Sequence, residues 1–154
     1  MRVYTKIGDI FSVKIDENTK KYFHLIAFDL TQLNSDVIRA FKKRYPVDDN
    51  PTISEIIQDK IDFYAHCVTK AGVKLGYWEK IGSIKEIGTL NHILFMNTND
   101  YGCKVGEDPV KISDKWYVWN INGEFRDVGK LVGENRKAYI GIVINLLAIQ
   151  HNAR

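Results

Sequence analysis

A short segment in the last third of the chain, KWYVWNINGEFRDVG (residues 115–129), carries large apolar rings on both faces of a predicted strand. Neighbouring side chains of an extended chain point to opposite sides, so Trp116 lies on one face while Tyr117 and Trp119 lie on the other. Rings of this size are most often in a core, which predicts that the strand is buried on both faces. The alternative is that one face is a binding surface.

The first 30 residues predict a hairpin of two strands. In residues 8–15 every second side chain, at Phe11, Val13 and Ile15, is apolar, which is the period-two pattern of a half-buried strand with these residues facing inward. After a polar turn, YFHLIAFD (residues 22–29) is apolar with few interruptions, as expected of a strand that is buried on most of both faces.

The next segment, NSDVIRAFKKRYP (residues 34–46), changes period and predicts a helix. Its apolar residues form one helical stripe, at Val37, Ile38, Phe41 and Tyr45. Ser35 is the predicted N-cap, and Pro46 follows as a stop. A second, shorter helix is predicted in TISEIIQD, where Thr52 and Glu55 have the spacing of a capping box.

The middle of the chain predicts strands. KIDFYAHCV (residues 60–68) alternates apolar side chains with polar or aromatic ones. The following TKAG is interpreted as a turn, which leads into a further antiparallel strand in VKLGYWEKIG (residues 73–82). HILFM (residues 92–96) predicts a short strand, and residues 97–113 predict a long loop that is rich in Asn, Asp and Gly.

Two strands complete the prediction. Asn122-Gly123 can adopt the positive backbone angles of a tight two-residue turn, which predicts that the aromatic strand pairs with the residues that follow it. AYIGIVINLLAIQ (residues 138–150) predicts a central strand followed by a short terminal turn, with a helix as the alternative.

These elements predict an α+β fold: a strongly curved, mostly antiparallel sheet, partly barrel-like, with two adjacent helices inserted after the first hairpin. A length of 154 residues with 45% apolar residues is typical of a single globular domain spanning 1–154. The N-terminal residues contain no apolar run long enough for a signal peptide, and no run in the chain is long enough for a membrane span, which predicts a cytoplasmic protein. Two cysteines, Cys67 and Cys103, are too few for a disulfide framework and are interpreted as free thiols.

The charged residues predict two neighbouring patches of opposite sign. The net charge does not indicate a nucleic-acid-binding protein. The formal net charge of +3 is far from the basic excess of a protein that lives on nucleic acid. A basic patch is predicted at Arg39, Lys42, Lys43 and Arg44, and an acidic stretch follows it at Asp48, Asp49, Glu55 and Asp59. Complementary patches of this kind steer partners together, although most charge runs are solvated faces.

No motif for a metal or a cofactor is present, so none is predicted. The four histidines are scattered, without a His-x-x-x-His or Cys-x-x-Cys pair, and no phosphate-binding loop occurs. The best candidate for acid-base chemistry is His66 beside Asp62 on one strand face, where the carboxylate can orient the imidazole. A structural or surface cluster is the simpler interpretation of these residues.

The opening KIGDIFSVKIDENTKKYFHLIAFD (residues 6–29) resembles the start of bacterial immunity protein 26 domains, in which a Gly-Asp-aromatic strand precedes a second, aromatic-rich strand. The resemblance implies a cytoplasmic, non-enzymatic antidote that binds and blocks a cognate polymorphic toxin. If that toxin is a basic nuclease, the acidic stretch is the predicted contact, at Asp48, Asp49, Glu55 and Asp59.

Two other functions stay open. A nucleic-acid-binding module would use the basic helix with exposed Tyr77, Trp78 or Trp119 as stacking platforms. A small hydrolase would use His66 and Asp62 at the wall of a pocket.

Overall fold

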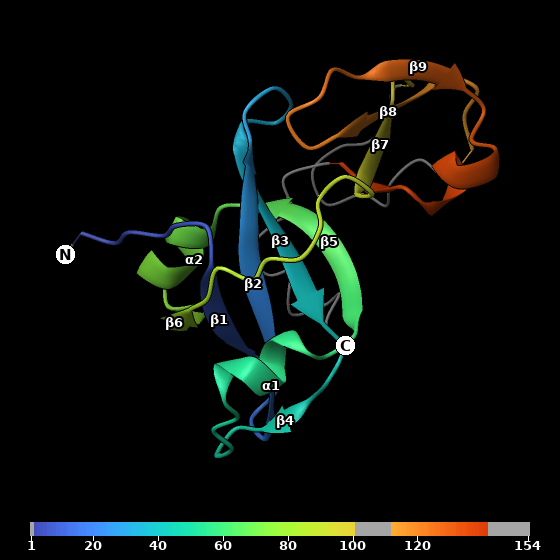
Figure 1. The fold of residues 1–154 in the computed structure, drawn as a ribbon. Helices are drawn as coiled ribbons and strands as arrows, with labels where there is room; N and C mark the ends of the chain where they lie inside the picture. The colour runs from blue at the N-terminus through green and yellow to red at the C-terminus, as the bar shows by residue number, and fades with distance from the viewer. Residues whose placement is uncertain (1, 101–111, 142–154) are drawn as a thin grey trace.

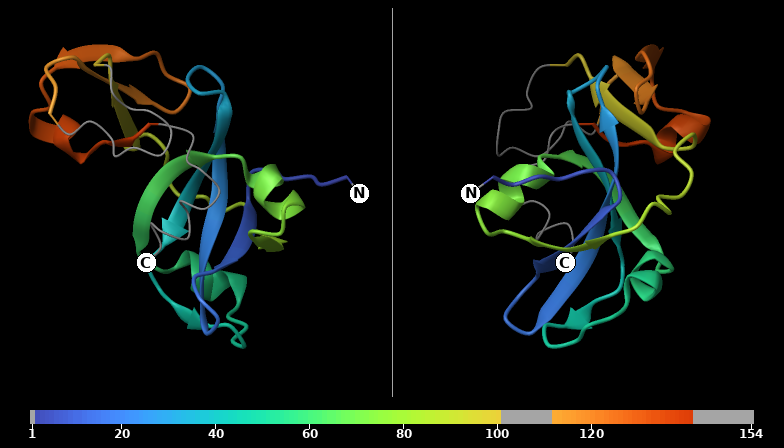
Figure 2. Two further views of the ribbon diagram at one scale, coloured as in Figure 1. Left: turned by 180° about the vertical axis from the view of Figure 1, so that it is seen from behind. Right: turned by 60° about the vertical axis from the view of Figure 1, so that its left-hand side comes forward.

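The fold, seen in a computed structural model that describes residues 2–100 and 112–141, contains two β-sheets and two short α-helices within those residues (Figure 1). The larger sheet has the order β5-β3-β2-β1-β6, with β4 paired to β2, and the smaller has the order β10-β7-β8-β9. Figures 1 and 2 show the smaller sheet at one end of the larger sheet and helix α1 at the other. The α+β class is therefore confirmed.

The bounds of the elements are as follows. The larger sheet contains β1 (Asp9–Lys14), β2 (Thr19–Asp29), β3 (Ser35–Phe41), β4 (Tyr45–Pro46), β5 (Ile61–Cys67) and β6 (Glu79–Ser83). The smaller sheet contains β7 (Leu94–Thr98), β8 (Trp116–Asn120), β9 (Arg126–Gly129) and β10 (Tyr139–Ile140). The helices are α1 (Ile53–Ile57), α2 (Thr69–Lys74) and the 3-10 helix η1 (Gly133–Lys137).

The N-terminal hairpin is confirmed. Strands β1 and β2 pair antiparallel, from Ile10 opposite His24 to Lys14 opposite Lys20. The predicted inward residues Phe11, Val13 and Ile15 are all buried, in a core that includes the ring of Trp78. Ile10 is buried on the opposite face, so the larger sheet is covered on both sides.

The helix predicted over residues 34–46 is wrong, because this segment forms strand β3 between β2 and β5. Both faces of β3 are buried: Val37 lies in one core cluster and Ile38 in another. A strand that is buried on both faces has no period-two polarity, so its apolar residues also matched a helical stripe. The β-branched pair Val37-Ile38 favours the extended conformation that the central position of the sheet requires.

The second predicted helix is confirmed as α1. Its N-cap is Thr52, whose hydroxyl accepts a hydrogen bond of 3.2 Å from the amide of Glu55. The predicted turn TKAG is instead the start of α2, and strand β5 separates the two helices, so they are not adjacent. Strands β5 and β6 form the two edges of the larger sheet and do not pair, so the barrel-like detail is not supported among the described residues.

The aromatic strand β8 is buried on both faces, as predicted. Trp116 is 4% exposed and Trp119 is 1% exposed, whereas Tyr117 is half-buried. The hairpin from β8 to β9 is also confirmed, but its connection spans residues 121–125 instead of two residues. Asn122 supplies the positive φ of 61° that the turn needs.

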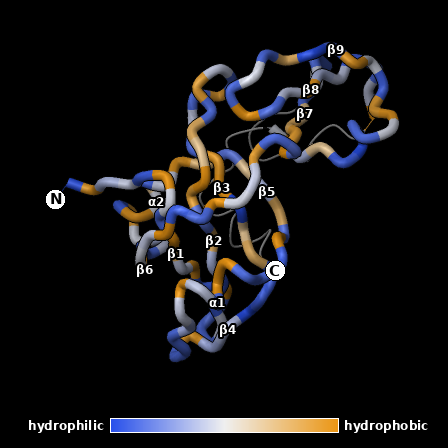
Figure 3. The backbone as a smooth tube through the Cα atoms, viewed as in Figure 1, coloured by the Kyte–Doolittle hydropathy of each residue, from blue (hydrophilic) through white to orange (hydrophobic). Residues whose placement is uncertain are grey.

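The hydrophobic residues follow this architecture. Figure 3 shows them in the strands of both sheets, with a mainly hydrophilic segment around the turn beside β4. Most of the predicted long loop (residues 101–111, with Cys103) and the end of the last predicted segment (residues 142–150) lie outside the described residues.

Candidate functional site

The predicted acidic contact residues lie at the end of the molecule formed by β4 and α1. Asp48, Asp49 and Glu55 are exposed, and Asp59 is half-buried. Tyr45 of β4 lies among them: burial raises the pKa of its phenol, and the nearby carboxylates of Asp59, Glu55 and Asp49 raise it further. The structure therefore brings three of the four predicted residues around one side chain, and we call these four residues the acidic cluster.

The members of the acidic cluster are not equivalent. Both carboxylate oxygens of Asp59 accept backbone hydrogen bonds, from the amide of Lys43 at 2.6 Å and from that of Lys60 at 2.7 Å. Asp59 therefore holds the residues between α1 and β5 against the connection between β3 and β4. The carboxylates of Asp48 and Glu55 make no hydrogen bond or ion pair with any described residue, which leaves them available to a partner.

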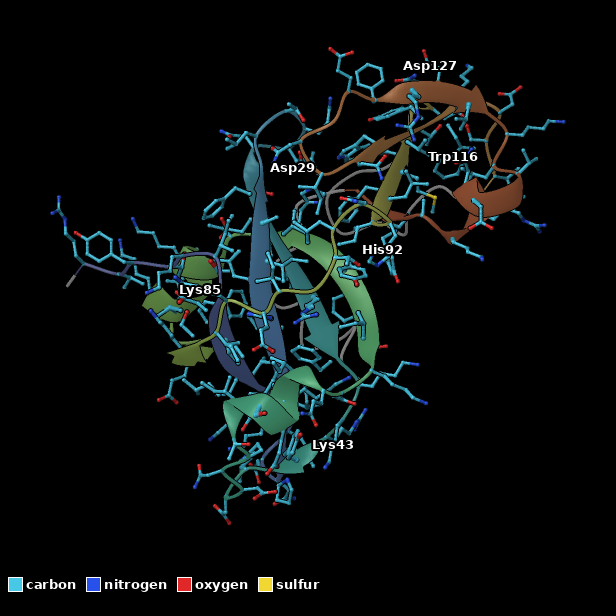
Figure 4. The ribbon with its side chains drawn as sticks, in the orientation of Figure 1. Asp29, Lys43, Lys85, His92, Trp116 and Asp127 are labelled. Carbon is cyan, nitrogen blue, oxygen red and sulfur yellow. The ribbon has the colours of Figure 1, made fainter. Side chains whose placement is uncertain are left out.

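Basic side chains border the acidic cluster. The ammonium of Lys43 lies 4.8 Å from the ring centre of Tyr45, and Figure 4 labels this lysine at the end of the molecule opposite the smaller sheet. The Nζ atom of Lys20 donates a hydrogen bond of 2.5 Å to the carbonyl oxygen of Asp49. The surface is thus of mixed charge, as the neighbouring patches of opposite sign predicted.

The predicted basic helix does not exist, since Lys42, Lys43 and Arg44 connect β3 to β4. Arg39 is not part of this surface: it is buried, its Nε donates to His24 Nδ1 at 3.2 Å, and its Nη2 donates to the carbonyl of Glu86 at 2.8 Å. Two of the three predicted stacking platforms, Trp78 and Trp119, are also buried.

The predicted pairing of His66 with Asp62 is wrong. Asp62 forms an ion pair with Lys21, at 3.1 Å, and His66 Nε2 instead lies 2.9 Å from Asp29 Oδ2. Asp29 and His66 are fully buried. The imidazole packs on Phe95, with 4.2 Å between the ring centres.

Asp29 joins the two sheets, a role that sequence reasoning missed. It ends strand β2, where Figure 4 labels it beside the smaller sheet. Its Oδ2 accepts a hydrogen bond of 2.9 Å from Trp119 Nε1, and its Oδ1 accepts one of 3.1 Å from the amide of Asn122. A carboxylate directly after the mostly apolar residues 22–28 was the available signal, but its partners could not be inferred.

The pKa values of this buried pair follow from its surroundings. Burial lowers the pKa of His66 and outweighs the attraction of the Asp29 carboxylate. Burial by itself raises the pKa of Asp29, but the hydrogen bonds from His66, Trp119 and Asn122 together bring it below its ordinary value. The pair therefore holds a carboxylate beside a neutral imidazole.

Because it has two buried histidines, we expect the folded protein to be less stable against unfolding in mild acid. Burial lowers the pKa of both His24 and His66, and the charge of Arg39 lowers that of His24 further. Below about pH 6.5 the unfolded histidines bind protons that the folded ones do not, so the free energy of unfolding falls. Urea unfolding is expected to show lower stability at pH 5.5 than at pH 7.5. Equal or higher stability at pH 5.5, or imidazole NMR titrations above pH 6.5, would contradict this.

The described residues offer no obvious place for a metal ion. No group of three or more His, Cys, Asp or Glu side chains that can hold one occurs in residues 2–100 and 112–141. In the same part of the chain, no helix has the length and apolar character to cross a membrane.

Comparison with known proteins places the sequence in a protein family. A sequence profile of Immunity protein 26 matches residues 6–101, which include β1 to β7. The chain belongs to the Immunity protein 26 family. No match was found among the curated proteins or among the solved structures.

Proposed function

We propose that this protein is an immunity protein that binds a cognate bacterial toxin and blocks it without catalysing a reaction. Membership of the Immunity protein 26 family is the observation that carries the proposal. The side chains of Asp29 and His66 are fully buried, and Asp29 also binds Trp119 of the smaller sheet. This arrangement supports a structural rather than a catalytic role for the two residues.

The acidic cluster is the proposed contact with the toxin. Its exposed carboxylates at Asp48 and Glu55 have no partner among the described residues, so a complex would not have to break existing ion pairs there. Charges of one sign on such a surface accelerate association with a partner of opposite sign. A basic toxin, such as a nuclease, fits this surface.

We further propose that the chain acts in the cytoplasm as one globular domain. In this proposal the interface is built mostly from the half of the molecule that holds β4 and α1. The smaller sheet would then not contact the toxin. Its role would be to support the fold through the hydrogen bonds of Asp29 to Trp119 and Asn122, which we call the Asp29 junction.

The experiment that tests the proposal is inhibition in solution. The cognate toxin, once it has been identified from the neighbouring genes, is expected to lose its activity when the purified protein is added. A toxin that stays fully active in the presence of excess protein would refute the proposed function.

A further inference from the structure

A hollow with a volume of about 670 Å³ lies beside the acidic cluster, and its charged lining residues are mostly lysines. Its wall comes from β1, β2 and β6, from α2 and the residues that follow it, and from Val47 after β4. The lining residues that matter for its chemistry are Ser12, Lys14, Lys20, Tyr77, Trp78 and Lys80. We call it the basic hollow.

Two lysines face each other across the hairpin at this hollow. Lys14 and Lys20 are direct partners in the antiparallel ladder of β1 and β2. Like charges opposite each other in a sheet destabilise it. The ammonium of Lys14 makes no hydrogen bond or ion pair with any described residue. The ammonium of Lys20 donates to the carbonyl oxygen of Asp49 and lies 5.7 Å from the ring centre of Tyr22. Neither charge is therefore neutralised by a carboxylate in the described part of the chain.

The third lysine differs from the other two. Lys80 forms an ion pair of 3.2 Å with the buried Asp9, so its charge is balanced. Glu79 is the one carboxylate among the described lining residues. Three lysines against the carboxylates of Asp9 and Glu79 leave the hollow with an excess of one positive charge, which favours an anionic ligand.

The apolar part of the wall favours an amino-acid side chain over a nucleotide. The ring of Trp78 is 4% exposed and its Nε1 is held by the carbonyl of Thr69 at 2.9 Å, so its face cannot stack on a base. Tyr77 is 37% exposed, and together with Val47 and Val73 it offers apolar surface to a short methylene stem. A carboxylate on such a stem matches both the charge and the wall.

We infer that the basic hollow receives an acidic side chain of the toxin next to the contact made by the acidic cluster. This inference rests on the proposed function. Lys20 connects the two surfaces, since it lines the hollow and bonds to Asp49, so they form one continuous surface of alternating charge. Charge patterns of this type set the orientation and the specificity of a complex.

The test is the substitution Lys14→Glu, compared with Lys85→Glu. Both lysines are exposed and both changes alter the net charge equally, but Lys85 lies outside the lining of the hollow (Figure 4). Because the introduced carboxylate would face Lys20, the melting temperature of the free Lys14→Glu protein should stay equal or rise. Its affinity for the toxin, measured by calorimetry, should fall at least tenfold, whereas Lys85→Glu should change affinity less than twofold.

The outcomes separate the inference from the proposed function. If the wild type binds the toxin and Lys14→Glu, together with the double variant Lys14→Glu/Lys20→Glu, binds within twofold of it, the inference is overturned while the function stands. If the wild type does not bind the toxin, both fall. If the wild type binds a single-stranded oligonucleotide and this binding is lost in Lys14→Glu, the hollow is a phosphate site and the inference is again overturned.

Discussion

Replacing Asp29 with alanine is expected to lower the free energy of unfolding by about 2–6 kcal/mol, because each buried donor left without an acceptor costs about 1–3 kcal/mol. The substitution would leave the buried donors of His66 and Trp119 without an acceptor. An unpaired buried donor keeps the full cost of leaving water. Because these bonds connect β2 to β5 and β8, the loss should be felt in both sheets, and urea unfolding measures it.

The matched control is Asp127→Ala. Asp127 is exposed on the edge strand β9, where Figure 4 labels it. This control should change stability by less than about 0.5 kcal/mol, as is usual for surface substitutions. A loss below about 1 kcal/mol for Asp29→Ala would show that the two sheets are held together by other contacts.

Reversing the charge of the acidic cluster is expected to weaken toxin binding at least 100-fold. The variant Asp48→Lys/Asp49→Lys/Glu55→Lys changes only exposed residues, and Asp59 is kept because its oxygens hold the amides of Lys43 and Lys60. A factor of 100 is about 2.7 kcal/mol, which is modest for several close charge pairs in an interface. Calorimetry with the purified toxin measures the affinity.

The control for the acidic cluster carries the same charge change elsewhere. Glu124→Lys/Asp127→Lys/Glu134→Lys alters three exposed carboxylates that accompany the smaller sheet. It should keep the affinity within about threefold, since distant exposed charges are screened by salt. If both triple variants lose affinity equally, the effect is one of net charge, and the proposed contact is wrong.

Local patterns predicted the hairpin of β1 and β2, the cap of α1 and the burial of the aromatic strand. These features depend on neighbouring residues: the alternation at Phe11 and Val13, and the spacing of Thr52 and Glu55. Strand β3 was missed for a physical reason, since a strand covered on both faces shows no alternation of polarity. Its apolar residues were therefore compatible with a helix.

The Asp29 junction could not be predicted, because its partners are distant along the chain. His66 is 37 residues away and Trp119 is 90 residues away. The sequence suggested the nearer carboxylate of Asp62, which the sheet turns instead toward Lys21. The residues of the acidic cluster and the basic hollow were visible as charges. Their arrangement depends on the pairing of β4 with β2, which a single sequence does not show.

We propose that this protein neutralises a toxin by binding it and not by catalysis. The most direct measurement is a titration of the activity of the cognate toxin, identified from the neighbouring genes, with increasing amounts of purified protein. If the protein is a tight-binding inhibitor, the toxin activity falls linearly with added protein and reaches its minimum at a fixed molar ratio. Longer incubation does not change that ratio. Two results would contradict binding inhibition. One is inactivation that progresses with time when far less protein than that molar ratio is present, and the other is undiminished toxin activity in excess protein.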